Sequence, residues 1–179
     1  MKAIMKEIFS TSIYILVVLC MTYLLVTFVG QRTQVVGSSM ETTLSDGDNL
    51  ILDKISYRFH DPERYDIIVF PFQYEEDTYY VKRIIALPGE TVQIDENGKI
   101  YINGEILHES YGREVIEDPG RAAAPITLAN DEYFVMGDNR NNSSDSRDPS
   151  VANIKRKDLI GKAFVRIWPL QKIGVMKHQ

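Results

Sequence analysis

Residues 91–102 read Thr91-Val92-Gln93-Ile94-Asp95-Glu96-Asn97-Gly98-Lys99-Ile100-Tyr101-Ile102. Two short runs rich in β-branched and aromatic residues flank a polar centre, which is the composition of two strands and their connection. The Asn-Gly dipeptide at 97–98 favours a tight turn, because both residues tolerate a positive φ. We therefore predict a β-hairpin over 91–102.

Runs of the same kind recur beyond residue 34, each bounded by Gly, Pro, Asp or Asn. They lie at residues 35–36, 49–55, 66–70, 78–86, 132–136 and 162–168. Residues 105–130, in contrast, hold two glycines and two prolines but few apolar runs, which indicates an excursion from the sheet. Because no long stripe of helical period occurs there, we expect a mainly β domain with a folded, barrel-like sheet.

The N-terminal region differs, since residues 8–29 contain no charged side chain. A helix rises about 1.5 Å per residue, so this length spans the roughly 30 Å hydrocarbon layer of a membrane. We therefore divide the chain into a short N-terminus (1–7), one transmembrane anchor (8–31) and a domain (32–179). A cleavable signal peptide is the alternative, but its apolar run is usually about 7–15 residues and ends in small residues, which 30–33 do not supply.

The positive charges near the anchor predict its orientation. Lys2 and Lys6 precede the apolar run, while only Arg32 follows it closely. Positive residues are enriched on the cytoplasmic side of membrane proteins. We therefore predict a single-pass protein of the cytoplasmic membrane, with the N-terminus in the cytoplasm and the domain extracytoplasmic.

The net charge argues against nucleic acid as a partner. The chain has 20 Lys and Arg against 25 Asp and Glu, and residues 1–32 hold three of the bases and one of the acids. Residues 33–179 therefore carry 17 basic and 24 acidic side chains, a net charge of −7 that repels phosphate backbones. Cys20, the one cysteine, lies in the anchor, so the domain has neither disulfides nor a thiolate metal cluster.

The histidines argue against two common hydrolytic designs. His60, His108 and His178 show no zinc-ligand spacing and no H-E-x-x-H, so we expect no metal. None lies in a recognisable triad motif, and no serine has a lysine three residues later, as penicillin-interacting enzymes require. A hydroxyl nucleophile in this chain would need a base other than histidine.

A lysine can be that base when it is neutral, and burial achieves this because desolvation lowers its pKa from about 10.4. Residues 79–90 place a lysine among apolar neighbours. On a strand, Tyr80, Lys82 and Ile84 would share one face, while Arg83 points the other way. The alternative is a lysine on the solvated face of an edge strand, its commonest setting.

Two polar segments could supply a nucleophile and its support. Residues 37–44 bend directly beyond the anchor, where Ser39 would expose its hydroxyl and its backbone N–H, although the same sequence suits an ordinary polar loop. Residues 137–148 are dense in Asp, Asn, Ser and Arg. They suit a solvated loop, with calcium binding as the weaker alternative, or an internally paired loop that positions a site.

These segments together resemble the bacterial type I signal peptidase family. Its motifs S-M-x-P-T-L, R-G-D-I-V-V-F, Y-V-K-R-I-x-G-L-P-G-D and G-D-N-R-x-x-S-x-D-S-R correspond to residues 39–44, 64–70, 80–90 and 137–147. The resemblance covers nearly the whole chain. A single anchor followed by a small domain is similar to the compact forms common in Gram-positive bacteria.

The resemblance implies a membrane-bound serine endopeptidase that needs no cofactor. It would remove signal peptides from exported preproteins, after small residues, through an acyl-enzyme. Ser39 would be the nucleophile, Lys82 the general base and Ser143 the hydroxyl that orients the lysine amine. Four residues would brace the site: Arg83, Asp138, Asp145 and Arg147. The implied partners are preproteins at the secretion machinery and membrane lipid, with no nucleic acid.

The chain departs from the family pattern at five positions. Thr42 stands in place of proline, Tyr65 and Ala86 in place of glycines, Glu90 in place of aspartate, and Gly37 where some relatives have an oxyanion-donating serine. Loss of the proline relaxes φ next to the nucleophile. We expect the second oxyanion donor to be a backbone N–H or a side chain from elsewhere.

Two other functions remain open at this stage. One is a membrane-tethered β domain that binds preproteins without cutting them. The other is a self-cleaving repressor, which also uses a serine and a lysine, but that family carries a DNA-binding domain where this chain has an anchor. Residues 122–124 are three alanines that meet the small-residue rule, yet Pro125 would follow the cut, so we do not expect self-cleavage.

Overall fold

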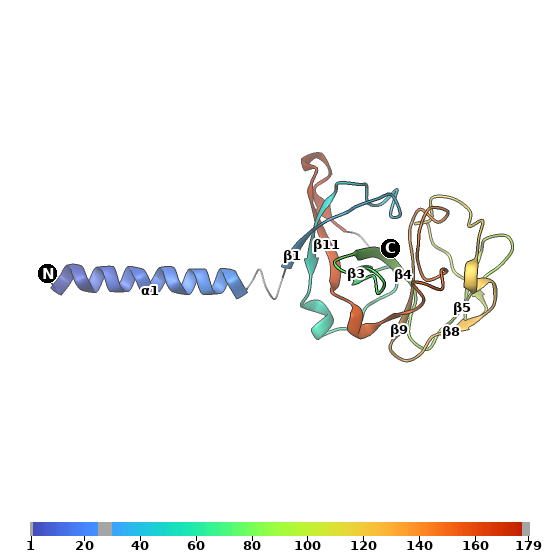
Figure 1. The fold of residues 1–179 in the computed structure, drawn as a ribbon, viewed down its shortest axis with the longest axis horizontal. Helices are drawn as coiled ribbons and strands as arrows, with labels where there is room; N and C mark the ends of the chain where they lie inside the picture. Colours follow the sequence, from blue (N-terminus) through green and yellow to red (C-terminus); the bar gives the residue numbers. More distant parts are fainter. Residues whose placement is uncertain (1, 25–29, 177–179) are drawn as a thin grey trace.

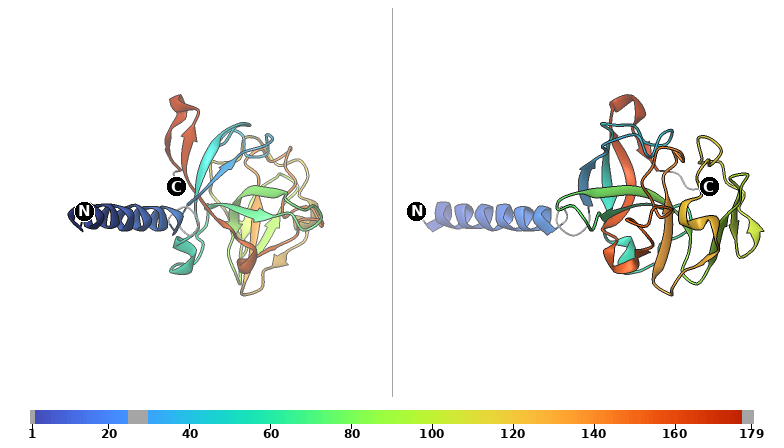
Figure 2. Two further views of the ribbon diagram at one scale, coloured as in Figure 1. Left: turned by 60° about the vertical axis from the view of Figure 1, so that its left-hand side comes forward. Right: turned by 45° about the vertical axis from the view of Figure 1, so that its right-hand side comes forward.

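The fold comes from a computed structural model that describes residues 2–24 and 30–176. Helix α1 (Lys2–Leu24) extends away from the β domain, as Figure 1 and Figure 2 show. Its segment Ile4–Tyr23 is long and apolar enough to cross a membrane, and none of it is buried. The helix begins at Lys2, whereas the uncharged run predicted a start at residue 8. Positions 25–29 of the expected anchor and His178 lie outside the described residues, and Gly30 and Gln31 belong to the first strand.

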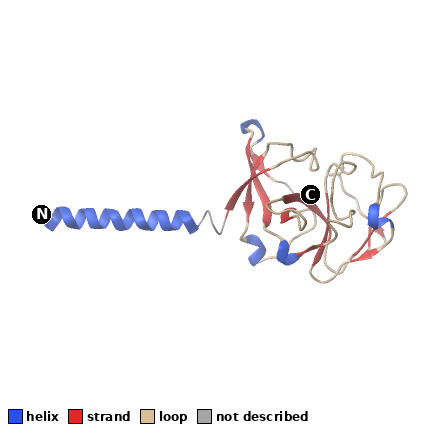
Figure 3. Ribbon diagram, in the orientation of Figure 1, coloured by secondary structure: helices blue, strands red, loops and turns tan. Residues whose placement is uncertain are grey.

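The described part of the domain is mainly β, as predicted (Figure 3). All pairings are antiparallel. The larger sheet has the order β1 (Gly30–Gln34), β2 (Asn49–Asp53), β11 (Gly161–Trp168), β3 (Ile67–Pro71), β4 (Tyr79–Ala86), β9 (Glu132–Met136) and β10 (Ile154–Lys155), and β12 (Gly174–Val175) pairs with β11. The smaller sheet has the order β7 (Glu105–Ile106), β6 (Ile100–Ile102), β5 (Thr91–Ile94) and β8 (Ile126–Thr127). Within the described residues, four short 3-10 helices lie in the connections between strands: Ser56–Arg58, Gly120–Ala123, Arg156–Asp158 and Leu170–Lys172.

The predicted hairpin is β5 and β6, which pair through Ile94 and Ile100. Its connection is longer than a two-residue turn. The N–H of Gly98 donates to Asp95 O at 3.0 Å, and the Asp95 carboxylate accepts the N–H of Lys99 at 2.8 Å. Only Gly98 of the Asn-Gly pair takes a positive φ, of 72°. The aspartate at the start of the loop therefore stabilises a five-residue connection with a glycine bulge.

The strand predictions fail where the chain is polar or the pairing is short. Residues 35–36 were expected to form a strand, but β1 precedes them and reads Gly-Gln-Arg-Thr-Gln, which has no apolar run. It pairs with β2, and the Arg32 guanidinium donates to Asn49 Oδ1 at 2.7 Å. Strands β7, β8, β10 and β12 have two residues each, too few to show a period.

Strand β4 runs through the centre of the domain, between β3 and β9. Ile85 and Ala86 at its end pack with Val92, Phe134 and Met136 in the core shared with the smaller sheet. Figure 1 shows this smaller sheet at the end of the domain far from α1. Residues 82–86 of β4 are buried, so this part of the strand gives firm support to the polar side chains that it carries.

Candidate active site

The nucleophile turn, residues 37–44, follows β1 and presents Ser39 at a cavity. Met40 and Leu44 are 1% and 0% exposed, so two apolar side chains anchor the turn in the core. Asn139, from the loop after β9, donates its N–H to Ser39 O at 3.0 Å. The side-chain amide of Asn139 donates to the carbonyl of Ser38 at 3.1 Å. The turn is thus held from the core side and from the facing loop.

The structure brings the two predicted catalytic residues together. Lys82 lies in β4, and its Nζ atom is 2.8 Å from Ser39 Oγ. The same amine donates to the carbonyl of Val81 at 3.1 Å. The ring of Tyr80 lies 4.9 Å from Nζ, measured to the ring centroid. A neutral amine held by the Val81 carbonyl can direct its lone pair to the serine hydroxyl.

Burial gives Lys82 the properties of a base. Its side chain is 4% exposed. Desolvation lowers the pKa of Lys82 to about 8, against the opposing effect of the Asp145 and Asp138 carboxylates, which raise it. At neutral pH about a tenth of such amines are uncharged. Lys82 can therefore take a proton from Ser39 near physiological pH.

Arg83 points to the opposite face of β4, as the strand period predicts, and it is fully buried. Its guanidinium forms a two-pronged ion pair with Asp138, with N–O distances of 2.8 and 2.7 Å. It also donates to Tyr65 O at 2.9 Å and to Thr43 Oγ1 at 3.3 Å. Arg83 thus joins the nucleophile turn, the start of β3 and the loop after β9.

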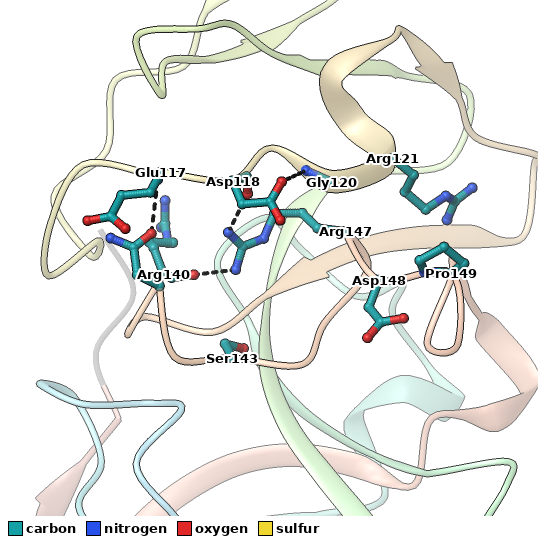
Figure 4. Close-up of a pocket in the computed structure, with 10 residues that line it drawn as sticks. Glu117, Asp118, Gly120, Arg121, Arg140, Ser143, Arg147, Asp148 and Pro149 are labelled. Carbon is teal, nitrogen blue, oxygen red and sulfur yellow. Dashed lines mark hydrogen bonds between the residues drawn. The ribbon is translucent and has the colours of Figure 1, made fainter.

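The loop at 137–148 is internally paired. Arg147 donates to both oxygens of Asp145 at 2.9 Å, and Asp145 also accepts the N–H of Gly137 at 3.0 Å. Arg147 reaches further, to the carbonyls of Asp118 and Arg140 (Figure 4). The reading of this segment as a loop that pairs internally is therefore correct.

Ser143 does not hydrogen-bond to Lys82 in this structure, whereas the resemblance implied that it orients the amine. Ser144 lines the cavity of the dyad, whereas Ser143 lines a second cavity of about 630 Å³, which Figure 4 shows. The Ser143 hydroxyl oxygen is buried and has no hydrogen-bond partner among the described residues. In this structure the Val81 carbonyl holds the amine instead. A role for Ser143 in orienting the lysine stays a prediction.

Gly137 is a site residue whose importance the sequence did not reveal. A Cβ atom there would collide with Ser143 Oγ and with the carbonyl oxygen of Ser39, well inside van der Waals distance. The Gly137→Ala substitution must push the loop away from the nucleophile turn. We expect a loss of about 100-fold in kcat/KM, because misplacement by about 1 Å has this effect. Steady-state kinetics with a labelled preprotein measures it.

The exposed Gly174 provides the matched control, since a Cβ there meets no atom within 4 Å. Gly174→Ala should leave kcat/KM unchanged. A Gly137→Ala enzyme with full activity would show that the loop can move without disturbing Ser39.

The dyad lies in a groove between two strand edges. The cavity, of about 470 Å³, is lined by residues 33–36 and 77–82 together with Ser39, Met40, Val69 and Ser144. Residues 79–82 of β4 pair with β3 only, and β1 pairs with β2 only. Both strands therefore offer backbone donors and acceptors to an extended peptide.

The nucleophile turn offers one backbone oxyanion donor. The N–H of Ser39 donates to no acceptor within the part of the chain that the structure describes. At Gly37, where some relatives have a donating serine, φ is 88° and no atom lies within 4 Å of the place where a Cβ would stand. No side chain from elsewhere fills that position.

Two departures from the family pattern have clear structural settings. Tyr65 has a φ of 74°, a conformation that costs a non-glycine residue about 1–2 kcal/mol, which accounts for a glycine in relatives. Glu90 pairs with Arg64 at 2.6 Å and accepts the N–H of Leu87 at 2.7 Å. The glutamate side chain, although longer than the aspartate of the family pattern, thus still caps the turn after β4 through the N–H of Leu87.

Comparisons with known proteins identify the family of the chain. The family described as "Signal peptidase, peptidase S26" matches residues 7–168. The "Probable signal peptidase I-2" of Synechocystis sp. is 41% identical over 156 residues, which are 84% of this chain and 68% of that protein. "Signal peptidase I P" of Bacillus subtilis subsp. natto is 36% identical over 166 residues, which are 89% and 88% of the two chains.

A crystal structure of a signal peptidase I from Enterococcus faecalis V583 is 33% identical in sequence. It matches 57% of this chain and 97% of that one, with a TM-score of 0.47. The family match covers more than half of the chain, and the relatives match along most of their length. The chain therefore belongs to the signal peptidase family, peptidase S26, as a signal peptidase I, a serine endopeptidase that removes signal peptides.

Proposed function

We propose that Ser39 is the nucleophile and Lys82 the general base of this signal peptidase. The observation that carries the proposal is the 2.8 Å distance between Ser39 Oγ and a buried Lys82 Nζ. Neutral Lys82 accepts the hydroxyl proton as Oγ attacks the scissile carbonyl carbon. The N–H of Ser39 faces the oxyanion of the tetrahedral intermediate.

The remaining steps use the same amine. When the intermediate collapses, the C–N bond breaks and the protonated Lys82 gives its proton to the departing amine, which is the new N-terminus of the mature protein. Lys82 is then neutral again and takes a proton from water, which attacks the acyl-enzyme carbonyl. The signal peptide leaves as a free carboxylate, and Ser39 regains its proton.

Four charged residues hold this arrangement. Arg83 and Asp138 tie the strand of Lys82 to the nucleophile turn, and Asp145 and Arg147 shape the facing loop. We assign them bracing roles, because none of the four bonds to Ser39 Oγ or Lys82 Nζ among the described contacts. The carboxylates of Asp145 and Asp138 also raise the pKa of Lys82, so the amine loses its proton less readily.

The substrate is a preprotein whose signal peptide reaches the groove in extended form. Strand addition along β1 and β4 supplies affinity that does not depend on side chains. Val35, Val36 and Met40 line the groove together with Ser39, and this apolar lining favours small apolar residues before the cut.

The membrane arrangement follows from the helix and the charges. Strand β1 begins six residues after α1 ends, so the groove lies close to the membrane in which the helix sits. Lys2 and Lys6 keep the N-terminus in the cytoplasm, and the domain meets preproteins outside it as they leave the secretion machinery. Membrane lipid is thus a partner, and the negative charge of the domain excludes nucleic acid.

The direct test is cleavage of a labelled preprotein by the detergent-solubilised full chain, beside Ser39→Ala and Lys82→Ala. Loss of cleavage in both variants supports the dyad. A parent chain that binds the preprotein but does not cut it would instead favour a non-catalytic binding protein.

The pH dependence of cleavage is a second test. Because only neutral Lys82 accepts the serine proton, activity is lost as the pH falls through the lowered pKa of about 8. We expect kcat/KM to fall about tenfold per unit well below pH 8 and to level off above it. Rates measured from pH 6 to 10 show this directly. A profile that is flat from pH 6 to 9 would contradict a lysine base.

A further inference from the structure

The segment 109–113, here called the strap, contacts three segments that carry the active site. It belongs to the excursion at 105–130, far in sequence from every catalytic motif. Three alternate side chains of the strap each contact a different part of the site: Glu109, Tyr111 and Arg113. The strap is thus tied to three separate parts of the site, which is unexpected for a solvated loop.

The first contact fixes the loop at 137–148. Glu109 forms an ion pair with Arg140 at 2.8 Å, and the two side chains are 9% and 2% exposed. Arg140 in turn donates to the carbonyl of Gly137 at 3.0 Å. A buried ion pair between two polar segments holds them at one separation. The strap therefore helps to place the loop that bears on Ser39.

The second contact reaches the nucleophile turn. Arg113 pairs with Glu41, two residues after Ser39, at 3.3 Å. Both side chains are well exposed, so this pair contributes little by itself. The backbone N–H of Arg113 also donates to Asp138 O at 3.0 Å. The end of the strap is thus bonded to the residue that pairs with Arg83.

The third contact covers the centre of the brace. The ring of Tyr111 lies over the guanidinium of Arg83, 3.6 Å from the ring centroid to Cζ. Tyr65 packs against Tyr111 with ring centroids 5.1 Å apart, and its carbonyl accepts from Arg83 at 2.9 Å. A cation on the face of an aromatic ring is attracted more strongly when water is excluded. Tyr111 closes the outer face of the Arg83–Asp138 pair.

Tyr65 is retained here in a backbone conformation that suits glycine, with a φ of 74°. Its ring and its hydroxyl, which donates to His108 O at 3.4 Å, both contact residues 108–111. The unfavourable backbone is thus offset by contacts with the strap.

We propose that Tyr111, supported by Tyr65, is a positioning residue for cleavage, which acts on the dyad through Arg83 and Asp138. The inference rests on the proposed roles of Ser39 and Lys82. Without the ring, water reaches the ion pair, and Asp138 loses its fixed position beside the nucleophile turn. The strap is then part of the catalytic framework of this chain.

The groups that face Lys82 determine how its pKa changes when the Tyr111 ring is removed. They are Ser39 from the nucleophile turn, Tyr80 from its own strand, and Asp138 and Asp145 from the loop. Asp138 raises the pKa of Lys82. Water that screens Asp138 weakens this effect, so removal of the Tyr111 ring moves the acid limb of the activity profile to lower pH.

The experiment compares Tyr111→Leu with Tyr111→Phe in the full-length chain in detergent, with a labelled preprotein as substrate. We expect Leu to lower kcat by about 10- to 100-fold with little change in KM, and to move the acid limb to lower pH. Phe keeps the ring over Arg83 and should retain kcat within about twofold. The control is Tyr101→Leu, which removes a tyrosine of the smaller sheet.

Tyr65→Gly carries the test if Tyr111→Leu fails to fold. It relieves the positive φ but also removes the contacts that offset it, so the melting temperature should change little, while kcat should fall several-fold because the support of Tyr111 is lost. A Tyr111→Leu enzyme with parental kcat and acid limb overturns the inference, as does a Tyr65→Gly enzyme with parental kcat. Cleavage that survives Ser39→Ala overturns the dyad and with it this inference. Cleavage that depends on Ser39 but not on Tyr111 overturns the inference alone.

Discussion

Replacing Lys82 with methionine is expected to lower kcat by about 100- to 10,000-fold, the usual contribution of a positioned general base. Methionine fills a similar volume but cannot accept the proton of Ser39. The Ser39→Ala substitution should have a larger effect, on the order of 10⁶-fold, because it removes the nucleophile itself. Single-turnover cleavage of a labelled preprotein measures both losses.

The fold should survive these substitutions. Lys82 is buried in an apolar setting that disfavours its charge, so methionine should leave the melting temperature unchanged or raise it. Lys82→Arg tests the charge: arginine stays protonated and should be as inactive as methionine. Lys99→Met, on the exposed loop between β5 and β6, is the matched control and should cleave normally. Substantial activity in Lys82→Met would rule out lysine as the base.

Replacing Asp138 with alanine should have the largest effect on stability. It leaves the fully buried Arg83 guanidinium without a counter-charge. Breaking such a pair from one side typically costs about 3–5 kcal/mol. For a domain of this size we expect a fall in melting temperature on the order of 10 °C, and thermal unfolding in detergent measures it.

Two controls separate a buried charge from the loss of any ion pair. Asp61 pairs with Arg156 at 3.0 Å but is 85% exposed, so Asp61→Ala should cost less than about 1 kcal/mol. The double variant Arg83→Met with Asp138→Leu removes both charges and should recover much of the stability, although not the activity. Equal melting temperatures for Asp138→Ala and Asp61→Ala would contradict the argument.

Much of the fold followed from local patterns. The helix, the hairpin and strands such as β4 and β9 are long or strongly apolar, so their own residues predict them. Ser39 and Lys82 were also predicted from sequence, because a neutral lysine needs an apolar strand and the motifs around both residues resemble one family; the structure brings the two side chains together. Strand β1 was missed because its polar residues become a strand only by pairing with β2.

The amino-acid sequence by itself determined the membrane helix, the β class and the chemistry available to the site, since these depend on composition, period and residue type. The tertiary structure decided which groups meet. It placed Val81 O rather than Ser143 on the lysine amine, set Gly137 against the nucleophile turn, and laid Tyr111 over Arg83. The last two contacts join residues tens of positions apart, and the geometry of all three depends on how the sheet folds and packs, which no local pattern records.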